Sequence, residues 1–98
     1  MKRDLAIAEI ANRTTDLKAR GAVAAFLFGS TMRDEADDKS DLDLFIDVMP
    51  DRKFSLIDLA GIQRFLQDEL HTAVDVTTRG SLHPKLRAEI ERQALRVF

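Results

Sequence analysis

The sequence predicts an α/β fold in which a small β-sheet of three or more strands is backed by helices. Three observations support this prediction. Apolar residues recur at helical spacing near the N-terminus, residues 22–28 are apolar at every position, and residues 41–48 and 73–78 alternate between apolar and polar side chains. The chain has 98 residues, of which 45% are hydrophobic and 33% charged, as in a soluble globular protein. We therefore expect one domain over residues 1–98.

The first half of the chain is expected to form a helix, a strand and a short helix. Apolar residues at three-to-four spacing predict one helix over residues 4–20, and Gly21 follows where a left-handed helix cap is expected. The run AVAAFLF at residues 22–28 lies between two glycines, which is typical of a strand covered on both faces. Residues 31–36 are predicted to form a short helix next to Ser30.

The second half continues the alternation of strands and helices. The sequence DLDLFIDV at residues 41–48 predicts a strand with aliphatic residues on one face and three aspartates on the other. Ser55 and Asp58 have the spacing of a capping box at the start of a helix over residues 55–71. A strand at 73–78 follows, and Pro84 suits the first turn of a closing helix whose apolar stripe extends to Val97.

The composition excludes several kinds of site. The chain has no cysteine, which excludes disulfides, thiolate zinc sites and cysteine nucleophiles. It has two histidines, His71 and His83, too few for a histidine-rich metal site. A bound metal ion would therefore need oxygen ligands. The formal net charge of −2 gives no basic footprint for duplex nucleic acid. Because no apolar run approaches the roughly 18 residues of a membrane span, and the N-terminus lacks an apolar signal core, we expect a cytoplasmic protein without membrane contact.

Aspartates form the candidate reactive cluster. Asp41 and Asp43 lie on the same side of the predicted strand, because side chains alternate along a strand that rises about 3.3 Å per residue. If Asp75 comes from a neighbouring strand, three carboxylates share a small volume, and two charges about 4 Å apart repel by roughly 4 kcal/mol at an effective dielectric of about 20. Such a cluster needs a cation, and Mg²⁺ or Mn²⁺ completed by nucleotide phosphates fits oxygen ligands.

A glycine-serine turn precedes the aspartates. Gly29 allows a phosphate to approach the backbone closely, and the hydroxyl of Ser30 can donate a hydrogen bond to it. Paired metal ions held by carboxylates are the usual arrangement for phosphoryl or nucleotidyl transfer. The two features together predict a metal-dependent nucleotide site.

These residues resemble the signature of the DNA polymerase beta-like nucleotidyltransferase superfamily. The whole chain looks like the minimal nucleotidyltransferase (MNT) domain, the antitoxin of HEPN/MNT toxin–antitoxin pairs. The similar segments are FGSTMR at residues 28–33, SDLDLFID at 40–47, VDV at 74–76 and LHPKLRAEIERQA at 82–94. The resemblance implies a nucleotidyltransferase fold with a small mixed sheet.

The resemblance also implies roles for individual residues. Asp41 and Asp43 would be metal ligands, and Asp75 a third ligand that acts as a base toward the attacking hydroxyl. Ser30, with the preceding glycine, would bind nucleotide phosphates, and Arg33 would contact phosphate or anchor the acidic loop. The implied reaction is the transfer of AMP from ATP, with Mg²⁺ as cofactor, to a tyrosine hydroxyl of a HEPN ribonuclease toxin with which the protein forms a hetero-oligomer.

Other interpretations remain open from the sequence. Asp41 and Asp43 could belong to a solvated acidic loop, which is the favoured interpretation for the acidic residues within 34–38. Gly29 and Ser30 could be only a turn and a helix cap, and Asp75 a polar position on an edge strand. Asp47 is expected to have a structural or solvent role and not to bind metal. At the level of function, the alternatives are an antitoxin that only occludes its toxin and, less favoured, transfer to a small molecule.

Overall fold

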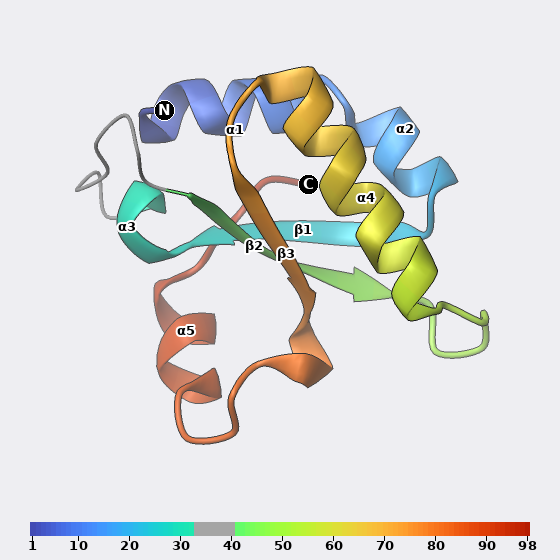
Figure 1. The fold of residues 1–98 in the computed structure, drawn as a ribbon. Helices are drawn as coiled ribbons and strands as arrows, with labels where there is room; N and C mark the ends of the chain where they lie inside the picture. The colour runs from blue at the N-terminus through green and yellow to red at the C-terminus, as the bar shows by residue number, and fades with distance from the viewer. Residues whose placement is uncertain (33–40) are drawn as a thin grey trace.

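The computed structural model describes residues 1–32 and 41–98 and contains a four-stranded mixed sheet (Figure 1). Its strands are β1 (Ala22–Phe28), β2 (Leu42–Val48), β3 (Val74–Thr78) and β4 (Leu95–Arg96), in the spatial order β3-β2-β1-β4. β1 pairs antiparallel with β2 and β4, whereas β2 and β3 run parallel. The predicted α/β class is confirmed.

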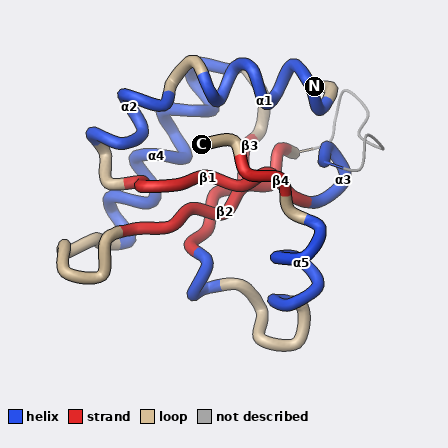
Figure 2. The backbone as a smooth tube through the Cα atoms, turned by 180° about the vertical axis from the view of Figure 1, so that it is seen from behind, coloured by secondary structure: helices blue, strands red, loops and turns tan. Residues whose placement is uncertain are grey.

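Helices cover the two faces of the sheet unequally. Helices α1 (Arg3–Ala11), α2 (Thr14–Ala19) and α4 (Leu56–Leu70) lie on one face, and α5 (Arg87–Gln93) lies on the other (Figures 1 and 2). The short elements are α3 (Gly29–Met32) and the 3₁₀ turn η1 (Arg79–Ser81). The three-helix face holds the main core, whose fully buried side chains include Ile10, Leu17, Leu27, Leu44, Ile62 and Leu66.

The three strands expected from the sequence are confirmed to within one residue. The alternation of residues 41–48 orients Leu42 and Leu44 to the core, but Phe45 on the opposite face is equally buried at 1% exposure. The reason is that α5 and aromatic residues cover that face as well. The capping box of α4 is present: the Ser55 backbone N–H donates to Asp58 Oδ2 at 2.8 Å, and Asp58 N–H donates to Ser55 Oγ at 3.2 Å.

Turn residues confirm one expectation and show the roles of both histidines. Gly21 adopts φ +112° after α2, the left-handed conformation expected of a helix cap. His71 ends α4 with φ +53°, and His83 Nδ1 accepts a hydrogen bond from the Lys85 backbone N–H at 3.2 Å. Both histidines therefore have local structural roles. The short helix expected at 31–36 begins earlier, at Gly29, and residues 33–36 lie outside the described residues.

The prediction of one N-terminal helix over residues 4–20 is wrong. The helix breaks at Asn12 and Arg13, because two of its last carbonyls accept hydrogen bonds from side chains. The Arg13 guanidinium donates to the Glu9 carbonyl at 2.7 Å, and the Thr14 hydroxyl donates to the Ala11 carbonyl at 2.7 Å. The chain changes direction there, so that apolar residues of both α1 and α2 reach the core.

The prediction of a closing helix extending to Val97 is also wrong. α5 ends at Gln93, and the chain returns to the sheet as β4, where Phe26 pairs with Arg96 and Leu27 with Leu95. The Val97 N–H donates to the Ala25 carbonyl at 2.8 Å. This pairing satisfies the backbone groups on the outer edge of β1, which a helical C-terminus would leave unpaired.

No helix within the described ranges, 1–32 and 41–98, is long and apolar enough to span a membrane.

Candidate active site

The strand register brings two of the three candidate aspartates together. Asp43 of β2 is the direct register partner of Asp75 in the parallel neighbour β3. Register partners on adjacent strands direct their side chains to the same face, here the face of α5. Asp41 immediately precedes β2, and the Leu42 N–H beside it donates to the Ala73 carbonyl at 2.9 Å. The condition that Asp75 lies on a strand next to Asp43 is therefore met.

The glycine of the predicted phosphate turn packs directly on Asp43. Phe28, the last residue of β1, is the register partner of Asp43, and Gly29 follows with φ +78°. A Cβ atom on Gly29 would collide with Asp43 Oδ2 and lie 3.2 Å from Asp43 Cβ and Cγ. Glycine is required here for two reasons, the left-handed backbone and the space occupied by the carboxylate. The turn and the aspartate therefore form one site.

Other predicted site residues are placed with less detail. Ser30 follows Gly29 in α3 and is half-buried, whereas Asp41 and Asp75 are exposed to solvent. Arg33, and the acidic residues within 34–38, lie outside the described residues. The structure thus assembles Gly29, Asp43 and Asp75 at one end of the sheet, with Ser30 and Asp41 adjacent in sequence.

The donor chemistry of this site suits a hard divalent cation. Within residues 1–32 and 41–98, no three side chains among histidine, aspartate and glutamate are close enough to hold a metal ion by themselves. Mg²⁺ does not need such a cage, because it is usually bound by one or two carboxylates, water and substrate phosphates. Asp43 and Asp75 in register, with Asp41 two residues away, provide carboxylates of the kind that Mg²⁺ prefers.

Arg79 is a residue that the sequence interpretation missed. Its guanidinium contacts both oxygens of Asp47, at 2.7 and 3.0 Å, and Glu91 Oε2 of α5 at 2.5 Å. It also lies over the rings of Phe26 and Phe45, 4.8 and 5.0 Å from their centroids. Hydrogen bonds to Asp47 and Glu91 raise the pKa of Arg79. The hydrogen bond from Arg79 in turn lowers the pKa of Glu91.

This contact gives Asp47 the structural role that was expected for it. Because Arg79 directly follows β3, the ion pairs hold α5 against the face of the sheet that carries Asp43 and Asp75. The sequence alone does not predict this contact, because Asp47 and Glu91 are 32 and 12 residues away from Arg79 along the chain.

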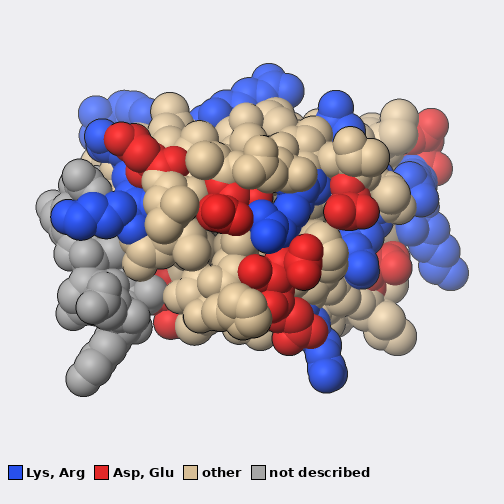
Figure 3. Space-filling view, turned by 90° about the horizontal axis from the view of Figure 1, so that it is seen from above, with Lys and Arg blue, Asp and Glu red and all other residues tan. Residues whose placement is uncertain are grey.

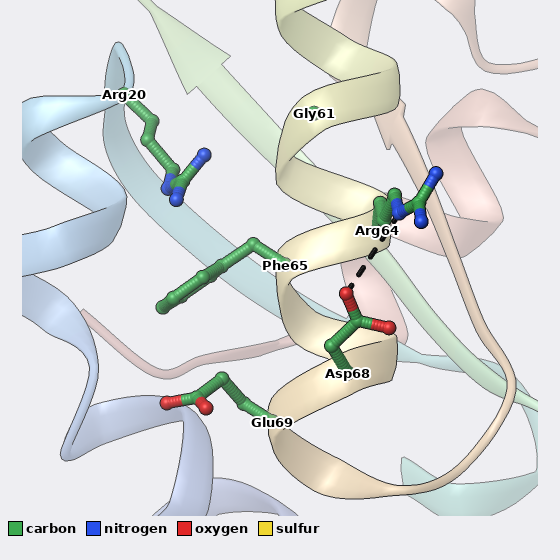
Figure 4. Close-up of a pocket in the computed structure, with 6 residues that line it drawn as sticks. All are labelled: Arg20, Gly61, Arg64, Phe65, Asp68 and Glu69. Atoms are coloured by element: carbon green, nitrogen blue, oxygen red, sulfur yellow. Dashed lines mark ion pairs between the residues drawn. The ribbon is translucent and has the colours of Figure 1, made fainter.

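A hollow on the other side of the molecule contains none of the predicted residues. It has a volume of about 460 Å³ and is lined by Arg20, Gly61, Arg64, Phe65, Asp68 and Glu69 (Figure 4). Its polar side chains pair locally: Arg64 lies 3.8 Å from Asp68, and the Arg20 guanidinium lies 4.3 Å from the centre of the Phe65 ring. The hollow is therefore the surface between α2 and α4, where the polar side chains interact with neighbouring residues.

Charges of both signs mix on that side of the molecule. In the view onto the helices, basic and acidic side chains alternate over the described residues (Figure 3). Arg13, for example, lies 2.8 Å from Glu9 and 3.5 Å from Glu69. This face therefore presents a mixed surface instead of a basic stripe of the kind that binds nucleic-acid phosphates.

A smaller hollow lies beside the candidate site. It has a volume of about 150 Å³ and is formed between the end of β1 and helix α5, with Gly29 in its wall. Gly29 thus contacts Asp43 and also borders this hollow.

Similar proteins match most of the length of this chain. A model of the nucleotidyltransferase domain family matches residues 7–97. A protein of Methanocaldococcus jannaschii, described as a candidate protein adenylyltransferase, is 35% identical over 82 residues, which are 84% of this chain and 86% of the relative.

Solved structures agree with this match. A structure described as a candidate minimal nucleotidyltransferase is 33% identical and superposes with a TM-score of 0.78 over 97% of this chain and 95% of the other. The MNT antitoxin in complex with a tri-AMPylated HEPN toxin from Shewanella oneidensis is 18% identical, with a TM-score of 0.65 over 90% and 68% of the two chains, and shares the fold. The present chain belongs to the nucleotidyltransferase domain family and has the fold of the minimal nucleotidyltransferases.

Proposed function

We propose that the protein is an Mg²⁺-dependent nucleotidyltransferase antitoxin, which transfers AMP from ATP to a tyrosine hydroxyl of a partner HEPN ribonuclease toxin and thereby neutralises it. The observation that carries this proposal is the packing of the Gly29 backbone against Asp43, which stands in register with Asp75. This arrangement places a backbone suited to phosphate next to carboxylates suited to Mg²⁺. Mn²⁺ would fit the same oxygen ligands.

The proposal assigns a role to each candidate residue. Asp41, Asp43 and Asp75 would hold the cation, which when bound offsets the charge of the triphosphate and of the departing pyrophosphate. Gly29 and Ser30 would bind the phosphates, and Arg33 would contact phosphate or anchor the acidic loop.

The transfer replaces a phosphoanhydride bond of ATP with a phosphoester bond to the acceptor. The acceptor oxygen forms a bond to the α-phosphorus as the bond to the β-phosphate oxygen breaks, and pyrophosphate leaves. Asp75 accepts the proton of the acceptor hydroxyl on its carboxylate, because it is the exposed member of the register pair and can meet a group that arrives from another molecule.

Two further facts support an acceptor on a partner protein. The chain contains no tyrosine, so a tyrosine acceptor has to belong to another molecule. The relative from M. jannaschii is described as a candidate protein adenylyltransferase, and the toxin in the Shewanella complex carries AMP groups. We extend the pairing of antitoxin and toxin in the Shewanella complex to the present chain. The two proteins would form this complex in the cytoplasm.

The experiment combines binding with transfer. Calorimetry measures ATP binding with and without Mg²⁺ in the wild type and in Asp43→Asn, and mass spectrometry follows the candidate toxin after incubation with ATP. We expect binding that depends on Mg²⁺ and is lost in Asp43→Asn, and a mass gain of about 329 Da for each AMP transferred. Equal ATP affinity in the wild type and the variant would disprove the metal assignment.

The Asp75→Asn variant separates catalysis from occlusion. We expect it to bind the toxin and retain nucleotide but leave the toxin unmodified and active, because Asp75 serves the transfer step. If Asp75→Asn neutralises the toxin as well as the wild type does at equal concentration, the protein acts by occlusion and the nucleotide site is regulatory or vestigial.

A further inference from the structure

The hollow between β1 and α5 has the position and lining of a base pocket. Phe28 and Gly29 form one wall, and Leu86, Glu89, Ile90 and Gln93 of the α5 region form the other. Gly29 borders both this hollow and the Asp43 carboxylate. A nucleotide whose phosphates lie against Gly29 can therefore extend its base into the hollow without leaving the α5 face of the sheet.

The walls suit a flat aromatic ring. Phe28 is half-buried, and its ring is tilted by 47° against that of Phe45 at a centroid distance of 5.8 Å. Leu86 and Ile90 add aliphatic surface, and Leu86 is 55% exposed. Bases stack on aromatic side chains in a manner that tolerates any base, so these walls provide affinity more than selectivity.

The polar rim carries groups that can distinguish one base from another. The Gln93 amide Nε2 donates to Glu89 Oε1 at 2.6 Å, and Arg92 holds both Glu89 oxygens at 2.5–2.6 Å. This contact fixes the orientation of the Gln93 amide and uses one of its two N–H donors. An amide carbonyl and N–H, which the Gln93 side chain provides, form a donor and acceptor pair that matches the adjacent acceptor and amino donor of adenine. Guanine offers two acceptors at the corresponding edge and leaves the Gln93 carbonyl unmatched.

Helix α5 is held in place by contacts outside the hollow. Glu91, which follows the lining residue Ile90 but does not itself line the hollow, receives Arg79 at 2.5 Å and Arg87 at 3.0 Å. The helix wall is thus attached to the sheet independently of any ligand, which gives the pocket a defined width before the nucleotide binds.

We propose that this hollow binds the adenine base of the nucleotide and that Gln93, oriented by Glu89, selects adenine over guanine. The proposal rests on the proposed nucleotidyltransferase function and adds to it the basis of nucleotide choice. It assigns to α5 a role in substrate recognition and leaves the metal ligands unchanged.

The test compares three probes: ATP, GTP and inorganic tripolyphosphate, each with Mg²⁺ and measured by calorimetry. The first variant, Leu86→Ala, has Leu56→Ala as its matched control, because Leu56 is an 84% exposed leucine of α4 that does not line the hollow. We expect Leu86→Ala to weaken ATP binding about tenfold and to leave tripolyphosphate binding unchanged, as loss of contact with a base requires. Leu56→Ala should leave both affinities at their wild-type values.

The second variant, Gln93→Ala, tests selectivity. Its side chain is exposed, so the substitution leaves the core intact. We expect the preference for ATP over GTP to fall about tenfold, with tripolyphosphate binding preserved. If ATP binds with Mg²⁺ but neither variant changes the ratio of ATP to tripolyphosphate or of ATP to GTP affinity, the base lies elsewhere and this inference is overturned while the proposed function stands. If the wild type binds neither ATP nor tripolyphosphate, the proposed function itself fails.

Discussion

Replacement of Gly29 by alanine gives the sharpest test of how the site is built. The φ angle of +78° places Gly29 in the left-handed region, where an L-residue costs about 1–2 kcal/mol. The added Cβ would also collide with Asp43 Oδ2, so the carboxylate has to move away from the turn. Displacing the Asp43 carboxylate, a charged ligand of the cation in the proposed site, removes an interaction of about 1.5–3 kcal/mol. This is equivalent to a loss of roughly tenfold to a hundredfold in affinity for Mg²⁺-ATP.

Gly21 provides the matched control for this substitution. It also has a positive φ, +112°, and a Cβ there would lie 3.0 Å from the Phe54 ring, remote from the aspartates. Urea denaturation should show both Gly29→Ala and Gly21→Ala to be destabilised by about 1–3 kcal/mol. Calorimetry should show a loss of Mg²⁺-ATP affinity only for Gly29→Ala. If the two variants lose affinity equally, the contact between Gly29 and Asp43 has no special role in the site.

Four further predictions concern stability. Ser55→Ala should destabilise the protein by about 1 kcal/mol in urea, because it removes the N-cap of α4. Hydrogen bonds from Ser55 lower the pKa of Asp58 in the folded protein. The stabilisation from this cap should therefore be complete above the ordinary pKa of 3.8 and should be lost as the pH falls through the lower folded pKa. A urea midpoint that stays constant between these pH values would contradict this prediction. Gly61→Ala should stabilise α4 by up to about 1 kcal/mol, since a Cβ there meets no atom within 4 Å, and a lower melting temperature would refute this. Arg79→Leu should accelerate amide exchange in α5 through loss of the contact with Glu91, whereas unchanged exchange would mean that α5 is held by other contacts.

The strands and α4 could be predicted because their signals are local. The alternation in residues 41–48, the fully apolar run at 22–28 and the spacing of Ser55 and Asp58 each specify an element without reference to distant parts of the chain. The position of Asp43 opposite the aliphatic residues of β2 could be predicted for the same reason, because side chains alternate along a strand.

The missed features depend on contacts between distant residues. β4 exists because the outer edge of β1 needs backbone partners, a requirement that the C-terminal sequence does not reveal. The break at Arg13 depends on a side chain that bonds to a backbone carbonyl one turn earlier, in a segment whose apolar spacing is helical throughout. Arg79 acquires its role only when Asp47 and Glu91 are brought to it by the fold.

The register of the sheet connects folding with the proposed chemistry. On β2, the core side carries Leu42 and Leu44, both at most 1% exposed, and the opposite side carries Asp43. A slip of one residue between β2 and β3 would break the pairing of Asp43 with Asp75, and would also turn the leucines away from the core and the carboxylate into it. Burying an unpaired carboxylate is far more costly than leaving it in water. The apolar packing under α1, α2 and α4 therefore selects the strand alignment that places the two carboxylates side by side. No additional interaction within the site is needed to set the register of β2 against β3.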